Sequence, residues 1–143
     1  MFKVYKIMEF VIAVFLLGLA YVDWKTRKVP VFALIGMTVI SAITRVFWTQ
    51  NTIWNTLGGI AIGILFLGIS KWSKEAIGYG DSWVILALGI GFGGLKLLQI
   101  LFVANFLASI VSLILCLGFK HSRTYALPYI PFLTIAYLGG MIL

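Results

Sequence analysis

Long stretches without Asp, Glu, Lys or Arg make up most of this chain, and the charged residues gather in the short segments between them. The uncharged stretches are residues 10–22, 29–44, 46–70, 82–95, 97–119 and 124–143. A helix of about 20 apolar residues is long enough to cross a bilayer, so each stretch predicts one membrane helix. We place these helices near residues 5–23, 29–47, 54–71, 82–94, 97–118 and 125–142.

The fourth predicted helix is short for a bilayer span, and a cluster of glycines follows its apolar residues. Gly91, Gly93 and Gly94 lie between the fourth and fifth predicted helices. Glycine accepts backbone angles that other residues avoid, and it often marks a turn. We therefore expect the chain to turn within this cluster rather than to continue as one long helix.

The composition agrees with this pattern, since 62% of the residues are hydrophobic, 10% are charged and the mean hydropathy is +1.11. These values exclude a water-soluble globular protein. They predict an all-α, polytopic membrane protein. Residues 1–143 are expected to form a single bundle of about six transmembrane helices, without a separate soluble domain.

The positive charges indicate an orientation, because cytoplasmic loops of membrane proteins are enriched in Lys and Arg. With the amino terminus outside, seven Lys and Arg residues fall in the inner loops and four in the outer segments. Both termini are then expected to be extracytoplasmic. The formal net charge of +7 is expected to serve contacts with anionic lipids, and nothing beyond this charge supports a nucleic-acid partner.

In this orientation two aspartates lie at the cytoplasmic face, Asp23 at the end of the first predicted helix and Asp81 at the start of the fourth. Taken singly, Asp81 is better explained as a helix cap after a glycine turn, and Asp23 as a capped or lysine-paired acid at the membrane interface. Two neighbouring carboxylates, however, cannot both ionise cheaply, so together they can share a proton and activate a water for peptide hydrolysis. Gly78 and Gly80 would give the chain before Asp81 backbone freedom and leave room for an approaching peptide.

The residues that usually bind metals are scarce. Cys116 is the single cysteine and His121 the single histidine, so neither an internal disulfide nor a cysteine metal site can form. A catalytic zinc ion normally has three protein ligands or more. The sequence therefore predicts no metal and no cofactor.

Three patterns in this chain resemble the type IV prepilin peptidase family, in its short form with little beyond the membrane core. The first pattern is Asp23, Thr26, Val29 and Pro30, and the second is Glu75, Gly78, Gly80 and Asp81. The third is Leu127-Pro128-Tyr129-Ile130-Pro131-Phe132, at the start of the sixth predicted helix. The resemblance covers nearly the whole chain, and three patterns in the right order are far more specific than any one of them.

The resemblance implies an intramembrane aspartic endopeptidase of the cytoplasmic (inner) membrane of a prokaryote. It would remove the short basic leader from type IV prepilins or pseudopilins at the cytoplasmic face, with Asp23 and Asp81 as the catalytic pair. Its partners would be that leader and the hydrophobic helix that follows it. Long forms of the family also methylate the new amino terminus and carry paired Cys-x-x-Cys motifs. Nothing in this sequence corresponds to them, so methyl transfer is not expected.

Two further residues are expected to bear on substrate binding. Glu75 would receive a leader Lys or Arg, although a structural pairing with Lys71 or Lys74 explains it as well. Trp83 stands where the family commonly has Lys, which removes a cation beside the site and concerns substrate preference rather than reaction type.

Two other functions use the same features differently. Buried carboxylates also serve proton or ion transport, in which case Asp23 and Asp81 would relay protons. A noncatalytic membrane assembly factor of a pilus or secretion machine is the second alternative. The sequence gives no chain of acids across the membrane, which favours the peptidase.

Overall fold

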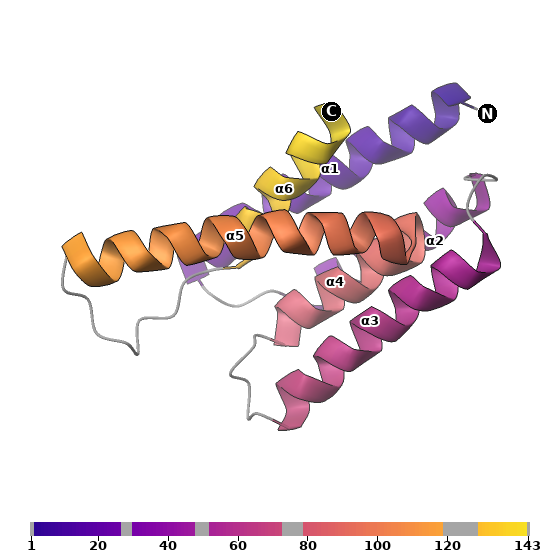
Figure 1. Cartoon of the computed structure of the whole chain (residues 1–143). Helices are drawn as coiled ribbons and strands as arrows, with labels where there is room; N and C mark the ends of the chain where they lie inside the picture. Colours follow the sequence, from indigo (N-terminus) through magenta and orange to yellow (C-terminus); the bar gives the residue numbers. More distant parts are fainter. Residues whose placement is uncertain (1, 27–29, 48–51, 73–78, 119–128, 143) are drawn as a thin grey trace.

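Six helices make up the part of the chain that the computed structural model describes, namely residues 2–26, 30–47, 52–72, 79–118 and 129–142 (Figure 1). They are α1 (Phe2–Thr26), α2 (Val31–Phe47), α3 (Ile53–Trp72), α4 (Tyr79–Phe92), α5 (Gly94–Gly118) and α6 (Ile130–Ile142). No strand occurs within those ranges. The predicted all-α class and the number of helices are thus confirmed for these residues.

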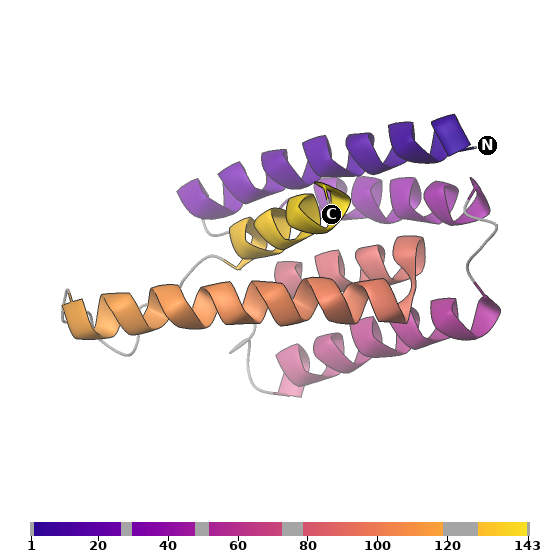
Figure 2. The same cartoon turned by 45° about the horizontal axis from the view of Figure 1, so that its top comes forward.

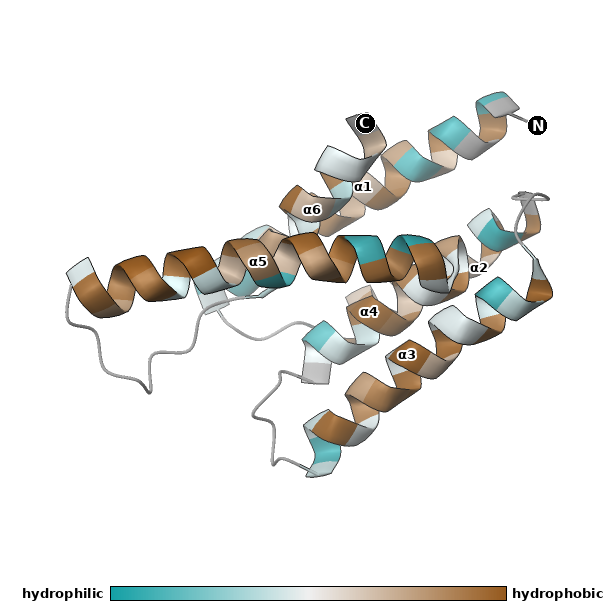
Figure 3. Ribbon diagram, viewed as in Figure 1, coloured by the Kyte–Doolittle hydropathy of each residue, from teal (hydrophilic) through white to brown (hydrophobic). Residues whose placement is uncertain are grey.

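Three of the helices are long and apolar enough to cross a membrane by themselves, namely the Lys6–Thr26 part of α1, α3 and α5. The other three are shorter apolar helices. At about 1.5 Å per residue, α4 spans only about 21 Å, less than the hydrocarbon core of a bilayer. Figure 3 shows that hydrophobic residues make up most of α3 and α5 along their length. The chain is therefore a helical membrane protein.

The short helix α4 lies at the centre of the bundle. It packs against α2, α3 and α5, while α1 packs against α2 and α6 (Figure 2). Val84, Ile85, Ala87 and Leu88 of α4 are completely buried. Lipid is as apolar as these side chains, so close packing rather than escape from water holds such helices together. The first residues of α4 are thereby fixed inside the protein.

Small residues allow α3 and α4 to touch through their backbones. Gly59 of α3 faces Gly89 of α4, and a methyl group on either one would collide with the backbone of the other. Gly63 meets Leu86 in the same way, one turn further along. Gly59 and Gly63 are four residues apart on α3 and so form one face of small residues, which lets the backbones of the two helices approach closely.

The turn between α4 and α5 consists of one residue, Gly93, whose φ is 86°. Side chains rarely tolerate this left-handed conformation, which explains the glycine. The N–H of Gly93 donates to the carbonyl oxygen of Gly89 at 2.9 Å, which closes the end of α4. The predicted turn within the glycine cluster is confirmed.

Helix α5 begins three residues earlier than the predicted start at 97. The side-chain oxygen of Asn55, on α3, accepts a hydrogen bond from the N–H of Leu95 at 3.0 Å. The first N–H groups of a helix lack partners within the helix, so this acceptor stabilises the early start. Because this capping residue is 40 positions away in the chain, the sequence around residue 94 does not indicate the early start of α5.

At the end of the bundle near the amino terminus of α1, an ion pair joins α1 to α5. Glu9 and Lys96 approach to 3.0 Å, and both side chains are largely buried. The Tyr137 hydroxyl on α6 donates to the carbonyl oxygen of Glu9 at 3.0 Å. The Lys96 ammonium group also lies 4.7 Å from the centre of the Phe92 ring, which attracts a cation. These contacts fix the end of the bundle opposite Asp23.

Candidate active site

Asp23 and Asp81 come from different helices but lie at the same end of the bundle. Asp23 is in the last turns of α1, and Asp81 is in the first turn of α4. The two carboxyl groups are close enough for the negative charge of Asp23 to act on Asp81. The pair that the sequence predicts is therefore brought together, although 58 positions separate its members.

The Asp23 side chain is buried, with 6% of the residue exposed, and points to the start of α6. Its Oδ2 atom accepts a hydrogen bond from the main-chain N–H of Ile130 at 3.3 Å. The N–H groups in the first turn of a helix have no partner within the helix and carry a partial positive charge. Helix α6 therefore supplies part of the polar surroundings that a buried carboxyl group requires.

Asp81 is partly buried in the first turn of α4. The next residue, Ser82, is fully buried and donates from its hydroxyl to the carbonyl oxygen of Phe66 at 3.3 Å, which ties this turn to α3. Gly80 also belongs to the first turn. Because α3 holds the first turn of α4, the position of Asp81 depends on the packing between these two helices.

A tyrosine completes this group of residues. Tyr129, directly before α6, lies near Asp81, and its hydroxyl donates to the side-chain oxygen of Asn105 on α5 at 2.8 Å. Burial and, to a smaller extent, the charge of Asp81 raise the pKa of Tyr129 to about 12. The hydroxyl therefore remains protonated and able to donate throughout the neutral range.

Tyr129, Asn105 and the N–H of Ile130 were not predicted as parts of the site. The sequence pattern at residues 127–132 places Tyr129 and Ile130 at the start of the sixth predicted helix but assigns them no role in the site. Asn105 did leave a signal, because it is a polar residue in the middle of the uncharged stretch 97–119. A polar side chain at membrane depth usually has a partner on another helix.

Of the remaining candidate site residues, the structure describes Trp83 but not Glu75 or Gly78. Trp83 is partly buried and packs against the hydrophobic core. It is two residues beyond Asp81, which on a helix is about 200° around the axis. Its role in substrate binding stays a prediction. Glu75 and Gly78 lie outside the residues that the structure describes.

Metal-binding side chains do not cluster within the described ranges, where no group of three or more His, Cys, Asp or Glu residues could hold an ion. Cys116 lies exposed on α5. His121 is outside those ranges.

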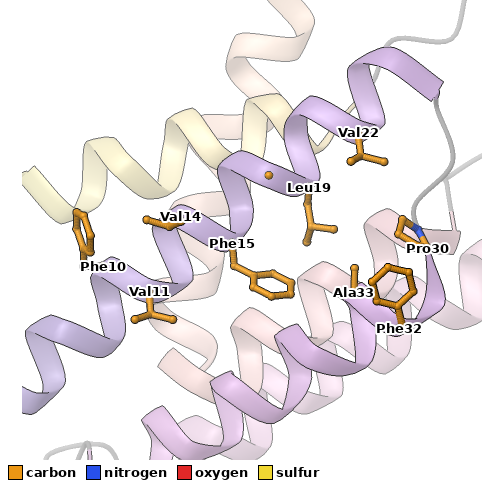
Figure 4. Close-up of a pocket in the computed structure, with 10 residues that line it drawn as sticks. Phe10, Val11, Val14, Phe15, Leu19, Val22, Pro30, Phe32 and Ala33 are labelled. Atoms are coloured by element: carbon orange, nitrogen blue, oxygen red, sulfur yellow. The ribbon is translucent and has the colours of Figure 1, made fainter.

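An apolar groove with a volume of about 530 Å³ runs between α1 and α2 (Figure 4). Phe10 lies toward one end, and Val22 and Pro30 lie toward the other. Although Val22 precedes Asp23 in the chain, Asp23 does not line the groove. The groove therefore lies beside the carboxylate pair but does not contain it.

Comparisons with known proteins identify the family of this chain. Residues 10–117, which include both Asp23 and Asp81, match the type IV leader peptidase family. A prepilin leader peptidase/N-methyltransferase of Pectobacterium carotovorum subsp. carotovorum is 30% identical over 138 residues, which is 90% of this chain and 48% of that protein. The chain thus spans about half the length of this curated relative, and no solved structure matches it. Because the family match covers most of the chain, the protein belongs to the type IV leader peptidase family.

Proposed function

We propose that this protein is an intramembrane aspartic endopeptidase that removes the short basic leader from type IV prepilins or pseudopilins. The observation that carries the proposal is that Asp23 and Asp81, from different helices of a member of the leader peptidase family, lie at the same end of the bundle, close enough for the charge of Asp23 to act on Asp81. Both aspartates are at least partly buried. Burial penalises a second negative charge next to the first, which favours a state in which the two carboxyl groups share one proton.

The chemistry follows from such a pair. One carboxylate takes a proton from a water molecule, whose oxygen attacks the scissile carbonyl carbon, while the protonated carboxyl group donates a hydrogen bond to the carbonyl oxygen. The C–N bond then breaks, and the leaving nitrogen takes up a proton. The two groups titrate as a unit, so neither is assigned the role of base.

Co-expression with a type IV prepilin tests this function. The prepilin should become smaller when the protein is present, and mass spectrometry should place its new amino terminus directly after the short basic leader. A prepilin that keeps its leader at full expression of the protein would overturn the proposal.

The site is proposed to lie at the cytoplasmic face of the inner membrane, with both termini of the bundle outside. Cysteine labelling checks this orientation in a Cys116→Ser background. A membrane-impermeant maleimide added to intact cells should label Asn51→Cys and should label Ser73→Cys only after the membrane is opened. The reverse pattern would place the carboxylate pair on the outer side and contradict the orientation.

Glu75 is proposed to bind a basic residue of the leader, a role that rests on its position six residues before Asp81. The Glu75→Gln variant should slow cleavage of a prepilin with a basic leader by about tenfold, the effect of one charge-assisted hydrogen bond. A prepilin whose leader Lys and Arg residues are replaced by Gln should be affected much less. An equal effect on both substrates would show that Glu75 does not recognise the leader.

The proton-transport alternative lacks a polar route along α1. Between Glu9 and Asp23, the buried residues of this helix are all apolar, namely Ile12, Ala13, Leu16 and Leu19. Glu9 is engaged with Lys96 at the far end. The described residues therefore favour peptide hydrolysis over a proton relay.

A further inference from the structure

The start of α6 links two polar contacts around the aspartates. Ile130 is the first residue of α6, and its N–H donates to Asp23. Tyr129 directly precedes it and donates to Asn105. Because adjacent residues share a peptide plane, a movement of Tyr129 also moves the N–H that contacts Asp23.

Asn105 lies at the same depth as the carboxylate pair. Helices α4 and α5 are joined by the single residue Gly93 and run in opposite directions (Figure 2). Asp81 and Asn105 are each twelve positions from Gly93, which corresponds to about 18 Å of helix on either side of the turn. The hydrogen bond between Tyr129 and Asn105 therefore lies beside the site rather than at a distant end of the bundle.

The surroundings favour this hydrogen bond. Asn105 belongs to an apolar helix and is exposed on the surface of the bundle. Lipid tails cannot form hydrogen bonds with its amide, so the hydrogen bond to Tyr129 is favoured. The pKa of Tyr129 at about 12 keeps its hydroxyl a donor at neutral pH. A further contact fixes the same turn of α6, since Thr134 donates to the carbonyl oxygen of Ile130 at 2.9 Å. The start of α6 is thus held from α5 on one side and from within the helix on the other.

We propose that Tyr129 is a positioning residue of the active site, which acts through its hydrogen bond to Asn105 and thereby holds the N–H of Ile130 on Asp23. The proposal rests on the function proposed above. Tyr129 contributes no proton to the reaction. It fixes the polar surroundings of Asp23, so its loss should lower the rate of the chemical step rather than the affinity for the substrate.

Tyr137, which lies within α6, provides a matched control for Tyr129. Tyr137 also donates its hydroxyl to another helix, to the carbonyl oxygen of Glu9 on α1, but at the opposite end of the bundle. Tyr137 is buried, with 1% exposed, and its hydroxyl donates one hydrogen bond, as that of Tyr129 does. Replacing either tyrosine by phenylalanine removes one hydroxyl and one hydrogen bond to another helix.

The experiment measures kcat and KM for cleavage of a type IV prepilin by the purified full chain in lipid nanodiscs. The variants are Tyr129→Phe, Asn105→Leu, their combination and Tyr137→Phe. Tyr129→Phe and Asn105→Leu should each lower kcat by about tenfold with KM within about twofold, and the combination should be no worse than either alone. Tyr137→Phe should keep its kcat even where its melting temperature falls.

Three results would overturn the proposal: unchanged kcat in Tyr129→Phe, a multiplicative loss in the combination, or an equal loss of kcat in Tyr137→Phe. If Tyr129→Phe does not fold, Asn105→Leu decides alone, since it removes the acceptor and leaves the tyrosine ring in place. Asp23→Asn and Asp81→Asn in the same assay separate the two proposals. Activity in these variants would refute the peptidase function, whereas their inactivity beside a fully active Tyr129→Phe would refute only the positioning role.

Discussion

Replacing Asp23 or Asp81 by asparagine should abolish removal of the prepilin leader. Asparagine keeps the size and shape of aspartate but cannot ionise, so the pair can no longer both take a proton from water and hold one for the carbonyl oxygen. Removing a general acid or base typically lowers a rate by about 10²–10⁴-fold. In cells, the co-expressed prepilin should therefore keep its full length on a gel with either variant.

An acid at the other end of the bundle provides the control for these variants. Glu9→Gln makes the same change from carboxylate to amide but affects the contact with Lys96, which lies at the opposite end of α1 from Asp23. It should leave cleavage within about twofold of the unchanged protein, because neither carboxylate of the pair is touched. Full processing by Asp81→Asn would remove Asp81 from the catalytic pair and leave the aspartic mechanism without support.

The convergence of the two aspartates could be predicted from the sequence because it depends only on the order of the helices. One aspartate ends the first predicted helix and the other begins the fourth, and the two crossings between them, by the second and third helices, bring these two ends to the same face. The predicted boundaries were off by a few residues, since α1 extends to Thr26 and Asp23 is in its last turns. For predicting that the two aspartates lie at the same face, the number of helices between them mattered more than the exact ends of those helices.

The surroundings of the aspartates could not be predicted in this way. The hydrogen bond from Ile130 to Asp23 uses a main-chain N–H, which every residue except proline has and which leaves no pattern in the sequence. The partners are 107 positions apart. Tyr129 could be found only through its partner Asn105, whose amide stands out within an apolar helix.

The α3–α4 contact should prove the most sensitive packing interface in the bundle, and Gly59→Ala should weaken it strongly. The new methyl group would meet the backbone of Gly89, which unlike a flexible side chain cannot move aside. Overpacking of this kind typically costs about 1–3 kcal/mol. The melting temperature in detergent should fall, and cleavage should decrease with it, because α3 also holds the first turn of α4 through Ser82 and so positions Asp81.

Gly58→Ala, the same substitution at the neighbouring position, is a matched control for Gly59→Ala. A methyl group on Gly58 has no atom within 4 Å, so Gly58→Ala adds no collision. Alanine is favoured over glycine inside a helix by about 1 kcal/mol, and this variant should melt at the same temperature as the unchanged protein or higher. The two variants have identical composition and adjacent positions, so a difference between them reports the contact with Gly89 alone. Equal melting temperatures would mean that α3 and α4 do not approach through Gly59, and the link from this interface to the position of Asp81 would be lost.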